Sequence, residues 1–305
     1  MTPVLWLWIP VTIWAAFAQT VRNAVQRGLT AELGTLGATL VRFLYGLPFA
    51  ALWLAVAQPF VGATLPSPGL RFLAWVLAGA LAQIAATALL LRTMEERNFA
   101  LGVAYSKSEV LQVAVFGLVL LGDPITPASG LAIAAGTAGV LLLSPAGWRA
   151  GFTSRTALLG LGSGAGFAFS AVGYRGAALA LGADSGGTPF LLAAAYTLLA
   201  AQIVQTLLLG GWLLVRRLST VLAVLRAWRA SLLAGFMGAA ASAGWFTAFA
   251  IEPAAHVRTL GLIELVFSYA VSRRLFREKL SRLELAGMAL LALGVVLITL
   301  RGPAG

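Results

Sequence analysis

The feature that most limits how this chain can fold is a succession of apolar runs, each of roughly 18 to 25 residues. A helix rises 1.5 Å per residue, so a helical run of this length crosses the hydrocarbon layer of a membrane. Charged residues make up 10% of the chain, whereas soluble globular proteins carry about 25%. We therefore expect an all-α, polytopic membrane protein whose solvent is lipid.

Proline, glycine and charge clusters separate these runs and predict about ten transmembrane helices. The expected spans are 3–21, 33–56, 71–92, 99–121, 127–144, 155–176, 188–213, 229–250, 256–272 and 283–300. No connection is long enough to hold a folded domain outside the membrane. We therefore expect a multi-pass protein of the cell inner (plasma) membrane whose function lies within the helix bundle.

The second half of the chain repeats features of the first at a spacing of 155 residues. This spacing aligns Glu109 with Glu264, and Asp123 with Glu278. It defines two five-helix repeats, 1–146 and 147–305. Because five is odd, the second repeat enters the membrane in the opposite orientation, and such inverted repeats are typical of secondary transporters.

Short motifs add a family resemblance to this arrangement. They are Arg42-Phe43, the related segments 121–126 and 276–281, and the Gly-Val pairs at 139–140 and 294–295. With these motifs the chain resembles the EamA branch of the drug/metabolite transporter superfamily over nearly its whole length. The resemblance implies a carrier, and export of amino acids or related amphipathic metabolites is the activity it suggests.

The distribution of basic residues predicts the orientation in the membrane. Fifteen of the 21 basic residues fall in the odd-numbered connections, Arg22 and Arg27 among them. The positive-inside rule places these connections in the cytoplasm and both termini outside, whereas the family resemblance implies termini inside. The net charge of +11 therefore reflects topology, and no nucleic-acid partner is expected.

Glu109 and Glu264 are the strongest candidates for substrate-binding residues. They are the acidic residues that lie well inside expected spans, and the repeat aligns them. A charge near the membrane midplane costs at least about 2.5–3.5 kcal/mol, so it needs a partner or a polar cavity. A structural ion pair is one interpretation, and a central substrate cavity with these carboxylates in its wall is the other.

Further candidates surround Glu109 on the sequence. Helical geometry places Tyr105, Ser108 and Gln112 on its face, whereas Lys107 falls about 200° away and is not expected to pair with Glu109. Lys107 and Arg42 complete the predicted substrate-binding set. Arg42 lies inside the second span and needs an acceptor, a role that either glutamate can fill.

Other motifs are better explained by structure. Thr126-Pro127 predicts an N-cap followed by proline at the first helical position, and 281–284 fits a capping box. Gly136 and Gly294, with similar glycines in the fifth and tenth spans, are expected to let these helices pack closely.

The chemistry-bearing residues exclude several function classes. The chain has no cysteine and one histidine, so no metal site or other cofactor is expected. It also lacks a nucleotide-binding loop of the G-x-x-x-x-G-K-[ST] type. We expect a monomeric secondary transporter of small molecules that works by alternating access, with protons as a candidate coupling ion. A non-enzyme is expected, and an intramembrane enzyme acting on a lipid or a membrane channel are the alternatives.

Overall fold

The computed structural model describes residues 6–96, 106–143, 155–184 and 187–276, together with isolated helical positions between 283 and 297. All regular structure in these ranges is helical. The helices are α1 (Trp8–Leu44), α2 (Leu47–Val61), α3 (Leu70–Glu96), α5 (Glu109–Leu121), α6 (Pro127–Leu143), α8 (Arg155–Asp184), α9 (Phe190–Gln205), η2 (Thr206–Gly210), α10 (Gly211–Arg216), α11 (Leu218–Arg226), α12 (Trp228–Ile251), α13 (Ala254–Leu260), η3 (Gly261–Ile263) and α14 (Glu264–Phe276).

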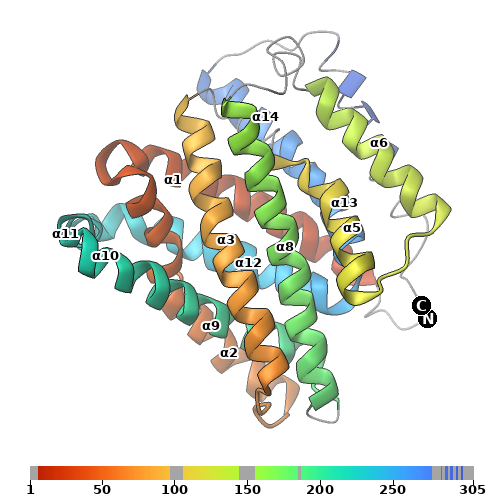
Figure 1. Ribbon diagram of the computed structural model, residues 1–305, viewed down its shortest axis with the longest axis horizontal. Helices are drawn as coiled ribbons and strands as arrows, with labels where there is room; N and C mark the ends of the chain where they lie inside the picture. Colours follow the sequence, from red (N-terminus) through yellow and green to blue (C-terminus); the bar gives the residue numbers. More distant parts are fainter. Residues whose placement is uncertain are drawn as a thin grey trace.

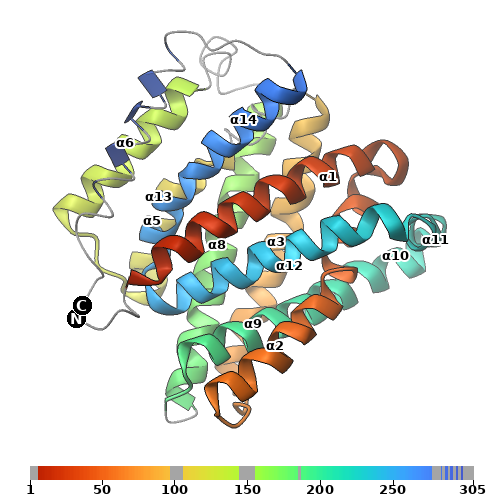
Figure 2. The ribbon, with the colours of Figure 1, turned by 180° about the vertical axis from the view of Figure 1, so that it is seen from behind.

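Two long helix pairs form opposite faces of the bundle. α3 and α8 lie side by side in Figure 1, and α1 and α12 lie side by side in Figure 2. Glycine allows the close approach in both pairs: a Cβ on Gly173 of α8 would lie 3.2 Å from Gly79 Cα of α3, and a Cβ on Gly244 of α12 would lie 2.8 Å from Ala15 Cβ of α1. Small residues at such interfaces drive helix packing in membranes.

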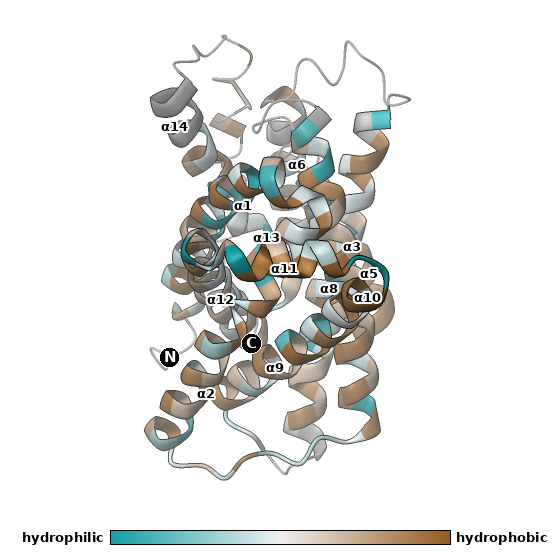
Figure 3. Ribbon diagram, turned by 90° about the vertical axis from the view of Figure 1, so that its left-hand side faces the viewer, coloured by the Kyte–Doolittle hydropathy of each residue, from teal (hydrophilic) through white to brown (hydrophobic). Residues whose placement is uncertain are grey.

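The outer surface of the bundle suits lipid. Within the described ranges, four segments, 8–61, 70–95, 190–216 and 228–251, are long and apolar enough to cross a membrane. Large apolar side chains point outward from them and from their ends, with Phe60 82%, Leu70 87% and Val215 83% exposed. Figure 3 shows the same predominance of hydrophobic residues along the helices. Such a surface is stable in lipid, where the helical backbone satisfies its own hydrogen bonds.

The predicted end of the first span, at residue 21, was wrong. Instead of stopping at residue 21, α1 continues to Leu44 and changes direction at Gly34, whose φ is +68°. Arg22 is therefore not in a connection but in the middle of a helix, with only 1% of its surface exposed. Arg22 therefore does not belong among the basic residues that the positive-inside rule counts in the connections. The second expected span, 33–56, is interrupted at the Tyr45-Gly46 turn before α2.

Several other boundaries and packing features agree with expectation. α6 begins at Pro127, and the Ser129 backbone N–H donates to Thr126 Oγ1 at 3.4 Å, so the predicted N-cap is confirmed. A Cβ on Gly294 would lie 3.2 Å from Gly136 Cα, which confirms the close packing predicted for these two glycines. The segment 281–284, where a capping box was expected, lies largely outside the described residues.

Candidate functional site

The local backbone places Glu109 and Glu264 in equivalent positions. Glu109 is the first residue of α5 and follows a tight turn in which the Val110 N–H donates to Lys107 O, three residues back, at 3.2 Å. Glu264 is the first residue of α14 and follows the 3-10 turn η3. Both carboxylates thus lie in the first turn of a helix, where the helix dipole favours negative charge. Both are buried, with 2% and 0% exposed.

Lys107 joins the two carboxylates. Its Nζ lies 2.5 Å from Glu264 Oε2 and 3.4 Å from Glu109 Oε1. The expectation that Lys107 and Glu109 do not pair was wrong, because it assumed a continuous α-helix at 100° per residue. Lys107 lies instead in the turn before α5, so its side chain points to the same place as that of Glu109.

Arg258 supplies the second cation. Its Nη1 lies 3.6 Å from Glu109 Oε1, and its guanidinium lies over two rings of α12, 4.5 Å from the centroid of Trp245 and 5.2 Å from that of Phe249. Desolvated cation–π contacts of this kind stabilise a buried guanidinium by about 2 kcal/mol. Lys107, Glu109, Arg258 and Glu264, which we call the central ion network, therefore contain two cations and two carboxylates.

Two amides of α1 complete the coordination of Glu264. Gln19 Nε2 donates to Glu264 Oε2 at 2.6 Å, and Asn23 Nδ2 donates to Oε1 at 3.0 Å. Trp245 Nε1 in turn donates to Gln19 Oε1 at 2.9 Å and orients that amide. Glu264 thus accepts from three side chains, whereas Glu109 Oε2 has no hydrogen-bond partner among the described residues. The two carboxylates are matched in position but not in coordination.

Arg42 lies apart from the glutamates. Its Nη1 donates to the Thr87 hydroxyl at 2.9 Å, so the acceptor expected from Glu109 or Glu264 is a neutral side chain instead. Arg22 lies nearby: the stems of both arginines pass Gly238 of α12, where an added Cβ would lie 3.3 Å from Arg42 Cγ and 3.4 Å from Arg22 Cδ. Arg22 donates to Asn23 Oδ1 at 2.6 and 3.2 Å.

A neutral polar triad lies between α3, α8 and α9. Tyr174 donates its hydroxyl to Gln83 Oε1 at 2.9 Å, and Gln205 Nε2 lies 2.5 Å from the same oxygen and 2.8 Å from the Tyr174 hydroxyl. All three side chains are buried. Satisfied polar groups in an apolar bundle tie helices together, and this triad connects the two halves of the chain.

The remaining predicted site residues have mixed outcomes. Ser108 and Gln112 are brought together, with Gln112 Nε2 donating to Ser108 Oγ at 3.2 Å. Neither side chain is bonded to the central ion network within the described part of the chain. Tyr105 lies outside the described residues.

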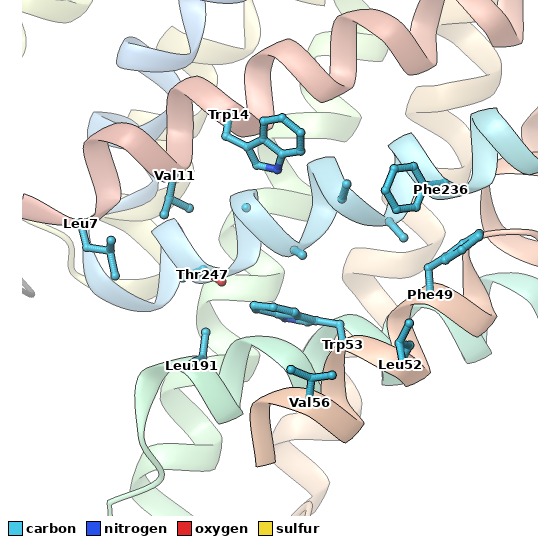
Figure 4. Close-up of a pocket in the computed structure, with 14 residues that line it drawn as sticks. Leu7, Val11, Trp14, Phe49, Leu52, Trp53, Val56, Leu191, Phe236 and Thr247 are labelled. Carbon is cyan, nitrogen blue, oxygen red and sulfur yellow. The ribbon is translucent and has the colours of Figure 1, made fainter. Parts of the chain in front are cut away.

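A pocket of about 490 Å³ lies away from this network, between α1, α2, α9 and α12. Figure 4 shows its lining, which is almost wholly apolar and includes Trp14, Trp53 and Phe236. Its α12 residues, such as Ala243 and Thr247, lie about 140–180° around that helix from Gly238. The pocket is therefore separated from the buried arginines by the thickness of α12.

Sequence patterns missed several buried polar residues. Asn23 was overlooked because the first span was expected to end at residue 21, whereas Gln19, inside that span, was not singled out as a site residue. Their i,i+4 spacing with a polar Gln26 on the same helix was a usable signal. Glu252 was assigned to a connection, yet it is 0% exposed and its Oε1 lies 2.6 Å from His256 Nδ1.

One motif has a structural explanation. Arg175 pairs with Asp123 at 3.0 Å and donates to the backbone carbonyls of Phe249 and Glu252 at 2.8 and 2.9 Å. It thereby fixes the end of α12 to α8 and to the connection between α5 and α6. Asp123 thus has a structural role in this arrangement.

The site is suited to charge-dependent binding. Its buried side chains are carboxylates, amides and cations, and no group of three or more His, Cys, Asp or Glu that could hold a metal occurs among the described residues. Such an arrangement can bind and release ions or polar solutes by exchanging internal salt bridges for contacts to a ligand.

Comparison with known proteins identifies the fold alone. No family model matches the chain, and no curated protein matches its sequence. A solved structure, described only as the crystal structure of a protein, has a similar fold, with a TM-score of 0.65 and 17% sequence identity over 96% of both chains. The chain therefore shares a complete fold with a protein of known structure, and its function must be inferred from its own residues.

Proposed function

We propose that this chain is a secondary transporter that carries small metabolites or amphipathic solutes across the cell inner membrane by alternating access. The observation that carries the proposal is the central ion network. Glu109 and Glu264, which are 155 residues apart, each begin a helix after a tight turn and share Lys107. Helices interrupted at corresponding positions of two halves are characteristic of transporter binding sites.

Helix packing supports two inverted repeats, with ten spans in total and a tenth at 283–300. In the 155-residue register, α1 corresponds to α8 and α3 to α12. The two dominant contacts, α1 with α12 and α8 with α3, exchange under this correspondence. The contact of α2 with α9 joins the second expected span to the seventh, and that of α5 with α13 joins the fourth to the ninth. These spans correspond in the same register, in which the direct counterpart of α5 is α14. This pattern is expected if repeats 1–146 and 147–305 are related by a half-turn.

The resemblance to the EamA branch extends the proposal to export of amino acids or similar metabolites. Interrupted helices allow one half to rock against the other, because the tight turns before Glu109 and Glu264 can change conformation without unfolding a continuous helix. In the described arrangement the network is closed, with the carboxylates covered by Lys107 and Arg258. We assign this arrangement to an occluded state.

Protons are the proposed coupling ion. A carboxylate that loses its cationic partner while remaining away from water favours its protonated form. Opening of the network would separate Lys107 from Glu264 or Glu109, allow that carboxyl to take up a proton, and let it release the proton when the partner returns. Glu109, with one unpartnered oxygen, is the more available of the two.

Counterflow in proteoliposomes tests the carrier proposal. Vesicles loaded with an unlabelled amino acid, amine or carboxylate should accumulate the radiolabelled form of the same solute transiently, because a carrier exchanges one molecule for another. A channel gives no such overshoot, and an enzyme gives a new product. If no solute in these three classes and no organic phosphate is exchanged, the carrier proposal is wrong.

Glutamine variants test the coupling. Glu109→Gln and Glu264→Gln keep the side-chain shape but remove titration, so the coupling residue should lose uptake driven by a pH gradient while retaining part of the exchange at equal pH. Glu32→Gln, at an exposed position, is the matched control and should behave as the parent. Unchanged gradient response in both buried variants would make these carboxylates structural.

A further inference from the structure

The buried interior of the described bundle contains more cations than carboxylates can pair. Lys107 and Arg258 are matched by Glu109 and Glu264 in the central ion network. The pair Asp123 and Arg175 is complete in itself, and the buried Glu252 has His256 as its neighbour. Arg22 and Arg42 remain, with 1% and 2% exposed and no carboxylate bonded to either.

Their hydrogen-bond partners are neutral and incomplete. Arg22 donates to the Asn23 side chain and Arg42 to the Thr87 hydroxyl. Arg22 Nη1 and Arg42 Nε are buried without any acceptor among the described residues. Neither guanidinium forms a direct ion pair, although the amide of Asn23 links Arg22 to Glu264. Buried charges of this kind in membrane proteins mark functional sites.

The two arginines also lie together. Both stems cross Gly238 of α12, and a Cβ there would lie within 3.4 Å of either side chain. The absence of a side chain at this position therefore makes room for the stems of two arginines that come from one helix, α1. Like charges held close together in this way are stabilised when an anion binds between them, and the planar donors of arginine match the oxygens of a carboxylate or phosphate.

We propose that Arg22 and Arg42 form the binding site for the oxyanion of the transported solute, either a carboxylate or a phosphate. The proposal rests on the carrier function proposed above and names its substrate class. Glu264 and Lys107 then act beside this site: Asn23 donates to Glu264 and accepts from Arg22, so occupation of the arginine pair by an anion is transmitted to the central ion network through one amide.

Matched solutes on one skeleton test the charge requirement. Phenylacetate, phenyl phosphate, phenylacetamide and phenethylamine are added separately to the detergent-purified protein, and the unfolding midpoint is measured. Phenylacetate or phenyl phosphate should raise the midpoint by about 2–4 °C at saturating concentration. The neutral amide and the amine should not. Equal or larger shifts with either of these two, or no shift with any of the four, would contradict the anion site.

Variants then locate the site. Arg22→Gln and Arg42→Gln should each weaken the anion's apparent affinity about ten- to a hundredfold, since each loses a charged hydrogen-bond donor. Arg229→Gln, at an exposed arginine of α12, is the control and should keep the parent affinity. Unchanged affinity in both buried variants would place the anion elsewhere and overturn the proposal.

The unliganded stability gives a second, independent measurement. Arg42→Met keeps the apolar stem and removes a charge that has no carboxylate partner, so its midpoint without ligand should equal or exceed that of the parent. A large drop would make Arg42 a structural residue. Counterflow separates this inference from the carrier proposal. Exchange of phenethylamine alone would support the carrier and reject the anion site. Anion binding without exchange would support the anion site and reject the carrier.

Discussion

Lys107 is the residue on which the central ion network depends most. It contacts both buried carboxylates, and Glu264 also needs the amides of Gln19 and Asn23. Because each half of the chain contributes one carboxylate, this single ammonium group holds the halves together at their most polar point. Any solute that competes for either carboxylate also loosens that contact.

Replacement of Lys107 by methionine should therefore destabilise the protein strongly. The variant leaves two buried carboxylates short of a partner, a change that costs about 3–5 kcal/mol when one member of a buried pair is removed. Thermal unfolding of the purified protein measures it. Arg92→Met is the control: its pair with Glu95 is 49% and 25% exposed, so its loss should cost at most about 1 kcal/mol. Similar losses in both variants would show that the network is not a stabilising contact.

At this scale the sequence indicated which residues matter but not how they meet. The repeat register identified Glu109 and Glu264 as a pair, and both are buried around one lysine. The contact of Lys107 with Glu109 could not be predicted, because it depends on the turn before α5. The partner of Arg42 could not be predicted because it depends on how α1 packs against α3. A helical wheel assumes 100° per residue, and the turn at Lys107-Ser108 does not follow it.

Helix lengths and breaks set the geometry at the next scale. Apolar runs predicted where helices occur, since the cost of exposing backbone to lipid enforces them. Their ends were harder to predict. Charged residues such as Arg22 suggested the end of a helix, yet Arg22 lies in the middle of α1, where it donates hydrogen bonds to Asn23 of the same helix. The break at Gly34 has φ +68°, a conformation that composition alone does not reveal.

Gly235 offers a direct test of how tightly the elements fit. A Cβ at this position of α12 would lie 2.5 Å from the backbone carbonyl carbon of Tyr45, at the turn between α1 and α2. Backbone cannot move aside as a flexible side chain can, so Gly235→Ala should destabilise by about 1–3 kcal/mol. Thermal unfolding gives the value.

Gly182→Ala is the matched control for this change. Gly182 lies in α8 with no atom within 4 Å of an added Cβ, so alanine there should be neutral or stabilise by up to about 1 kcal/mol through its higher helix propensity. If Gly235→Ala is as well tolerated as Gly182→Ala, the close approach of α12 to Tyr45 does not occur in the membrane.

The whole molecule is suited to a topology experiment because the chain contains no cysteine. Ser67 lies in the connection between α2 and α3, and Ser219 lies in α11; both are exposed. In inverted repeats these positions lie on opposite sides of the membrane. Arg216, Arg217, Arg226 and Arg229 surround α11, so the positive-inside rule places Ser219 in the cytoplasm.

Single-cysteine labelling should show this asymmetry. Ser67→Cys is expected to react with a membrane-impermeant maleimide in intact cells, and Ser219→Cys only after the membrane is permeabilised. The cysteine-free parent is the blank. Labelling of both from the same side would rule out the inverted arrangement, and the opposite assignment would keep the inversion but reverse the orientation.

The position of Lys107 also bears on the direction of movement. In the 155-residue register its counterpart is Leu262, and the counterparts of Arg22 and Arg42 are Ala177 and Thr197. These three cations thus belong to the first half alone, and Arg258 of the second half likewise has no basic counterpart, since residue 103 is valine. If the halves exchange roles during the proposed cycle, the inward-facing and outward-facing conformations cannot have equal free energies. We therefore expect the empty carrier to be mostly open to one side of the membrane. It should take up solute more readily from that side.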